Sequence, residues 1–83
     1  MEDSEKLAAL ANLYRLAIEH SLWQTTSGTE DLAILTKDIL LGQANGLKPV
    51  WRREGTRMTG FLNKNPLLRH QLSDYIDFKG FKD

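Results

Sequence analysis

Cysteine is absent from this chain of 83 residues, and its absence excludes several kinds of chemistry. Without thiols there can be no disulfide framework, no thiolate zinc site, no iron–sulfur cluster and no cysteine nucleophile. Valine occurs once and proline twice, and no stretch alternates β-branched and polar residues as a half-buried strand does. Leucine, alanine, glutamate, lysine and arginine are frequent instead, which predicts an all-α fold.

Long apolar runs and a basic amino-terminal segment are also lacking. The segment from Met1 to Glu5 carries three carboxylates, where a secretory signal would be basic. No apolar run approaches the length needed to cross a bilayer. We therefore expect a cytoplasmic protein without membrane contact. With 41% hydrophobic and 27% charged residues, the composition is that of a globular protein, and the length allows one core and one domain, residues 1–83.

The formal net charge of zero conceals an uneven distribution of charge along the chain. Residues 1–45 carry three basic and seven acidic side chains, whereas residues 46–83 carry eight basic and four acidic ones. Segments of opposite sign can attract each other within one fold, or leave a charged pole that faces a partner. The sequence leaves both interpretations open.

Capping and breaking signals divide the chain into four predicted helices, at about residues 4–23, 29–41, 49–63 and 66–78, with a tail at 79–83. Ser27 and Glu30 have the spacing of a capping box for the second helix, and Gly42 follows its end. Pro49 and Pro66 suit the first turn of the last two helices. The predicted architecture is a compact bundle of four short helices, or of five if Gly55 or Gly60 divides the third.

Asn45-Gly46 offers a competing interpretation of the middle of the chain. This dipeptide is typical of a type I′ turn between two short strands. Pro49 would then lie in the second strand and remove a backbone donor from it. We therefore favour a loop followed by a helix that starts at Pro49, with the hairpin as the minor alternative.

The first two helices carry more apolar surface than a single core-facing stripe requires. The stripe expected to face the core consists of Leu7, Leu10, Ala11, Tyr14, Ala17 and Ile18. A second stripe has the four-three spacing of a coiled-coil seam and consists of Ala9, Leu13, Leu16, His20 and Trp23. On the second helix, Ile34 and Leu41 lie nearly opposite the expected core residues Leu32, Leu35, Ile39 and Leu40. The extra residues contact other helices of the same bundle, or they bind a partner.

The third helix carries a basic strip. Arg53, Arg57 and Lys64 share a narrow side of the helix, with Arg52 and Thr56 further round. Arginine forks on a helix that follows a glycine-containing turn are typical of a helix-turn-helix recognition helix, which contacts phosphates and base edges. A solvated basic face is the ordinary alternative.

The fourth helix and the tail offer two further candidates. His70, Asp74 and Asp77 lie near one face, but three ligands from one helix are a weak metal signal, so we expect a solvated face and no metal. Phe78 can complete the core. Phe81, beyond Gly80, either folds back onto the bundle or anchors a partner.

No nucleophile elbow, phosphate-binding loop or readable catalytic triad is present. We therefore expect a non-enzymatic protein with no catalytic residue, no cofactor and no small-molecule substrate. The predicted function is that of a small regulatory or adaptor protein that binds another protein or a second copy of itself through the first two helices. The predicted anchors are Leu13, Leu16, Trp23, Ile34, Leu41 and Phe81. The alternative is a helix-turn-helix-like nucleic-acid-binding regulator that uses Arg52, Arg53, Thr56, Arg57 and Lys64.

Overall fold

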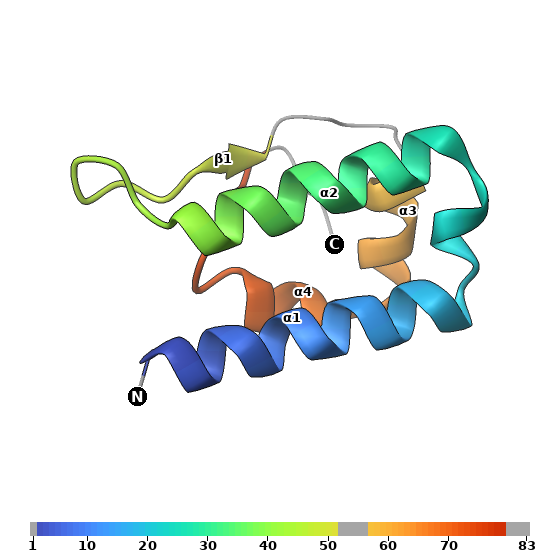
Figure 1. Cartoon of the computed structure of the whole chain (residues 1–83), viewed down its shortest axis with the longest axis horizontal. Helices are drawn as coiled ribbons and strands as arrows, with labels where there is room; N and C mark the ends of the chain where they lie inside the picture. Colours follow the sequence, from blue (N-terminus) through green and yellow to red (C-terminus); the bar gives the residue numbers. More distant parts are fainter. Residues whose placement is uncertain (1, 52–56, 80–83) are drawn as a thin grey trace.

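The computed structural model describes residues 2–51 and 57–79, and within these residues the chain forms four α-helices and two short strands (Figure 1). The elements in chain order are α1 (Glu2–Glu19), the 3₁₀ turn η1 (Leu22–Gln24), α2 (Thr26–Leu41), β1 (Val50–Trp51), α3 (Arg57–Lys64), α4 (Pro66–Leu72) and β2 (Asp77–Phe78). The predicted small all-α bundle is confirmed.

The two long helices form one layer and the two short helices a second layer. In Figure 1, α1 and α2 run antiparallel along the long dimension of the molecule, and α3 and α4 lie behind them. α1 contacts α4, and α2 contacts α3 and η1. The core between the layers collects buried side chains from every helix. Its completely buried large members are Leu13, Leu35, Ile39, Met58, Leu62, Leu72, Ile76 and Asp31.

α1 ends earlier than predicted, at Glu19 instead of Trp23. Ser21 has a left-handed backbone conformation with φ of 56°, so the helix cannot continue through it. The 3₁₀ turn η1 then places Leu22 in the core and leaves Trp23 exposed. The reversal of the chain at Ser21 therefore sets the antiparallel course of α2.

α2 begins at Thr26, three residues before the predicted start, and its N-cap is Thr25. The Thr25 hydroxyl accepts a hydrogen bond from the Gly28 backbone N–H at 3.0 Å, so Ser27 lies inside the helix and the predicted capping box is wrong. Gly28 packs against η1 so closely that a Cβ atom there would lie 2.0 Å from the Leu22 carbonyl oxygen. Glycine at this position permits the contact between η1 and α2. The helix ends at Leu41 before Gly42, as predicted.

The turn at Asn45-Gly46 does form, although its flanks pair through only one isolated bridge among the described residues, Ala44 with Leu47. Both central residues have positive φ, 54° for Asn45 and 77° for Gly46, as a type I′ turn requires. The Leu47 N–H donates to the Ala44 carbonyl at 2.9 Å. The alternative that we ranked second is therefore correct for the turn itself.

The predicted helix start at Pro49 is wrong. Val50 and Trp51 are extended and pair in parallel with Asp77 and Phe78, and the Asp77 N–H donates to the Pro49 carbonyl at 2.9 Å. The extended chain lets the Trp51 side chain enter the core, where it is 2% exposed. The later part of the predicted helix is confirmed as α3, which continues through Gly60, whereas Gly55 lies outside the described residues.

α4 begins at Pro66 as predicted but ends at Leu72, before the predicted end at Phe78. The Ser73 backbone N–H is shared between the carbonyls of Arg69 and His70, and its hydroxyl donates to the His70 carbonyl. Such local bonds by serine compete with helix continuation. The chain then turns and enters β2, which places Ile76 in the core and packs Phe78 against it.

Candidate protein-binding face

α1 exposes an apolar row that is separate from its buried side. The row consists of Leu7, Ala11, Tyr14 and Ile18, which have four-three-four spacing and therefore share one face of the helix. Leu7 and Ile18 are 60% and 63% exposed, more than large aliphatic side chains of a helix usually are when they serve the core. The row contains no charged residue.

The exposed row on α1 contradicts part of the sequence prediction, because its residues were expected to face the core. Leu10 and Ala17 of the expected core stripe are buried, but the other four members of that stripe form the exposed row. The core instead receives Ala9 and Leu13 of the expected seam, and Leu16 is partly buried against it. Leu13 is completely buried within its own chain, so it is not available to a partner and its prediction as a surface anchor is wrong. This part of the seam faces inward, toward α4, which packs beside α1 through the Asn12–Gln71 hydrogen bond, whereas His20 and Trp23 are exposed.

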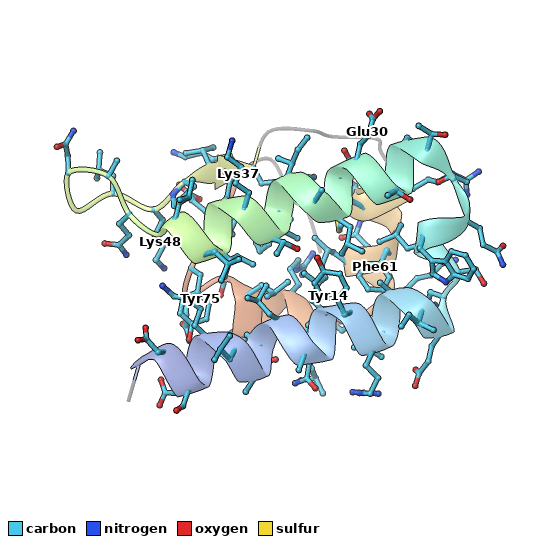
Figure 2. All side chains as sticks on the ribbon, in the orientation of Figure 1. Tyr14, Glu30, Lys37, Lys48, Phe61 and Tyr75 are labelled. Atoms are coloured by element: carbon cyan, nitrogen blue, oxygen red, sulfur yellow. The ribbon has the colours of Figure 1, made fainter. Side chains whose placement is uncertain are left out.

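α2 extends the exposed row across the front of the molecule. The Tyr14 hydroxyl lies 2.7 Å from the Thr36 hydroxyl oxygen, and Figure 2 shows the Tyr14 side chain between α1 and α2. Because the Thr36 hydroxyl donates its proton to the Leu32 carbonyl, Tyr14 is the donor in this pair. The exposed residues Ala33 and Leu40 lie on the same face of α2 as Thr36. We call the surface formed by Leu7, Ala11, Tyr14, Ile18, Ala33, Thr36 and Leu40 the α1–α2 face.

Leu40 also corrects the sequence prediction, which placed it in the core. Its side chain is 54% exposed, whereas Leu32, Leu35 and Ile39 are buried as predicted. Leu40 stands at the edge of the buried stripe of α2, on the side of α2 where Thr36 meets Tyr14. The periodicity of the sequence places Leu40 at the edge of the apolar stripe of α2, but it could not show whether a residue at that edge is buried by a neighbouring helix or remains exposed to solvent.

The other predicted anchors are scattered. Ile34 and Leu41 are exposed on one side of α2, but at 100° per residue that side lies roughly 100–160° from Thr36 and Leu40 around the helix axis. Trp23 is exposed in η1, and Leu16 is partly buried on α1. Phe81 lies outside the described residues. The structure therefore does not join the predicted anchors into one surface.

The basic strip is described only in part. Arg57 and Lys64 are exposed on α3 and line one shallow hollow together with His20 and Phe61. Among the described residues, no carboxylate lies within ion-pair distance of either cation. Arg52, Arg53 and Thr56 lie outside the described residues. The His20 ring packs edge-on against Phe61, with 5.7 Å between the ring centroids.

The predicted solvated face of α4 holds no metal-binding group within the described chain, where no three His, Asp or Glu side chains come together to ligate an ion. Asp77 lies in β2 and not in the helix predicted for it, and its carboxylate lies 3.9 Å from the Lys79 ammonium. In residues 2–51 and 57–79, no helix combines the length and the apolar character that a membrane crossing requires.

Comparison of the chain with protein-family models, with curated proteins and with solved structures gives no match.

Proposed function

We propose that this chain is a protein-interaction module that forms a homodimer through the α1–α2 face. The observation that carries this proposal is the exposed, uncharged row of Leu7, Ala11, Tyr14 and Ile18 on α1. Large contiguous apolar patches on the surface of a soluble protein often mark a protein–protein contact. Covering such a patch with a second apolar face is the direct way to remove it from water.

The row is self-complementary when two copies of α1 lie antiparallel. A two-fold axis between Asn12 and Leu13 sets Leu7 opposite Ile18 and Ala11 opposite Tyr14 of the second copy. Each large aromatic ring then faces a small alanine, and the branched aliphatic side chains pair at the ends. A parallel arrangement would place the two tyrosines against each other and leave the two alanines across a gap. The antiparallel form also repeats each contact twice, as an isologous dimer does.

Tyr14 is suited to the centre of such an interface. Aromatic residues are enriched in the buried centres of protein interfaces. Because its hydroxyl is already bonded to Thr36, the ring can be covered without leaving an unpaired donor. The hydrogen bond also fixes the ring between α1 and α2 before association, which reduces the entropy lost on binding.

We expect Ile18→Glu to abolish the dimer. Burial of an isoleucine side chain contributes about 1.5–3 kcal/mol, and each dimer contains two copies of the substitution, so Kd should rise at least about 100-fold. Sedimentation velocity over a range of concentrations measures this change. Circular dichroism should be unchanged, because Ile18 is exposed in the single chain.

Leu41→Glu is the matched control. Leu41 is 73% exposed but lies outside the α1–α2 face, so its replacement should leave Kd unchanged. A wild-type chain that sediments as a monomer at high micromolar concentration would contradict the proposal. Equal loss of the dimer in both variants would assign the interface to another surface.

A helix-turn-helix-like nucleic-acid-binding regulator is the second candidate, and the exposed Arg57 and Lys64 of α3 favour it. If phosphates bind there, the chain is retained on duplex DNA at low salt, the binding weakens steeply as salt rises, and Arg57→Glu removes it. Under the homodimer proposal we expect no retention. Absence of retention at low salt excludes the second candidate.

A further inference from the structure

A second surface, on the other side of α1, has the features of a binding groove. It has a volume of about 410 Å³ and lies between α1 and the segment where α3 passes into α4. Its apolar lining comes from Leu16, Pro66, Leu67 and Leu68. Leu67 is 85% exposed, an unusual position for a leucine unless something covers it. The volume lies within the range of ligand-binding clefts.

Two amides provide polar groups in the groove. The Asn12 side-chain N–H donates to the Gln71 side-chain oxygen at 3.0 Å, which joins α1 to α4. This bond leaves the Asn12 side-chain oxygen as an acceptor and the Gln71 NH₂ group as a donor. A polypeptide backbone offers the complementary donor and acceptor in every residue. A hydrocarbon chain offers neither, so these amides favour a peptide.

Two cations also line the groove. Among the residues that the structure describes, Lys64 has no ion-pair partner, and Arg15 forms an exposed pair with Glu19 at 3.3 Å. An exposed pair of this kind contributes at most about 1 kcal/mol, so Arg15 can turn to another carboxylate at little cost. Lys64 also lines the adjacent hollow with Arg57. An apolar lining beside Arg15, Lys64 and the neighbouring Arg57 is complementary to leucine-type side chains that alternate with aspartate or glutamate.

We propose that this groove binds an acidic, leucine-containing peptide segment of a partner protein. The leucine side chain covers Leu16 and Leu67, and the neighbouring carboxylates pair with Lys64 and Arg15. Leu16 and Asn12 lie far from Tyr14 around the α1 axis, so the groove and the α1–α2 face can be occupied at the same time. The groove does not depend on the homodimer for any of its residues.

A labelled, capped peptide that alternates pairs of aspartates with leucines is the probe, and fluorescence anisotropy at low salt measures its Kd. We expect Lys64→Glu and Leu67→Ser each to raise Kd about tenfold or more, since each loses a contact of roughly 1.4 kcal/mol or more. Both side chains are exposed, so the fold should be retained. Lys37→Glu, an exposed lysine on α2 away from the groove, is the control and should leave Kd unchanged (Figure 2).

Two control peptides separate charge from apolar contact. Replacing every aspartate by asparagine, or every leucine by alanine, should abolish binding, and amide chemical shifts should move at Asn12, Leu68 and Gln71 with the original peptide only. No binding of the original peptide at millimolar concentration overturns the proposal. Duplex DNA binding that is lost in Lys64→Glu but unchanged in Leu67→Ser also overturns it, because phosphates need the cations and not the leucine. Sedimentation of the same variants reports on the homodimer separately.

Discussion

Replacing Gly28 by alanine is expected to lower the free energy of unfolding by about 1.5–5 kcal/mol. The new Cβ atom would lie 2.0 Å from the Leu22 carbonyl oxygen and 2.8 Å from the Thr25 hydroxyl. The nearer atom is backbone, so η1 must move away from α2. Overpacking in a tight site costs about 1–3 kcal/mol, and displacing the Thr25 cap costs about 0.5–2 kcal/mol more.

Gly60→Ala is the control for Gly28→Ala, because both glycines are helical. A Cβ atom at Gly60 meets no described atom within 4 Å, so alanine should stabilise α3 by up to about 1 kcal/mol. Urea unfolding followed by circular dichroism measures both changes. We expect the free energy of unfolding to fall in Gly28→Ala and to rise in Gly60→Ala, although the substitution is the same. A Gly28→Ala variant as stable as the wild type would show that η1 does not pack against α2 as described.

Leu13→Ala is expected to cost about 2–5 kcal/mol, the range for a leucine truncated inside a well-packed core. Leu13 is completely buried, and the bundle can close only part of the cavity. Leu7→Ala, on the same helix, should change stability by no more than about 0.5 kcal/mol in the monomer, as exposed substitutions usually do.

The two leucine variants test which side of α1 faces the core. Urea unfolding at concentrations below the dimer Kd keeps association out of the comparison. If Leu7→Ala were the more damaging change, the stripe that the sequence first suggested would face the core after all.

The helical class of the fold was predictable because its signals are local. The lack of alternating β-branched stretches, Pro66 in a first helical turn and Gly42 after a last turn are signals that depend only on residues close to one another in the sequence. The four helical segments therefore appear where they were expected, with shifted ends. The ends shifted where a tertiary contact determines them. The second helix was predicted to begin at residue 29, after Gly28, because the packing of Gly28 against Leu22 is a contact that the local sequence does not reveal.

Pro49 illustrates a signal with two valid interpretations. The fixed φ and the missing N–H of proline suit the first turn of a helix. They equally suit an extended residue whose backbone nitrogen is not required as a hydrogen-bond donor. The choice came from residues far along the chain, since Asp77 and Phe78 pair with Val50 and Trp51. Sequence periodicity within one segment carries no information about such a distant partner.

For the candidate surfaces, the sequence predicted an excess of apolar residues but not which of those residues are exposed. The sequence indicated that α1 and α2 carry more apolar side chains than one core needs, and the exposed row on α1 agrees with that. It could not show which stripe was the surplus, because Leu7 and Leu13 have the same side chain and belong to stripes of similar apolar character. The groove was missed because its lining comes from α1 and from the segment where α3 passes into α4, and the periodicity of one segment does not show which distant segment lies beside it.

The parallel pair of β1 and β2 has a consequence for the order of folding. Val50 pairs with Asp77 across 27 residues, and a parallel pair cannot be closed by a tight turn. The two ends of the segment that contains α3 and α4 must come together before the strands can pair. The chain therefore loses the conformational entropy of loop closure before the strand pair contributes stability. We therefore expect the hydrogen bond from the Asp77 N–H to the Pro49 carbonyl to form late in folding, so that this amide becomes protected from solvent exchange only when the native fold is complete.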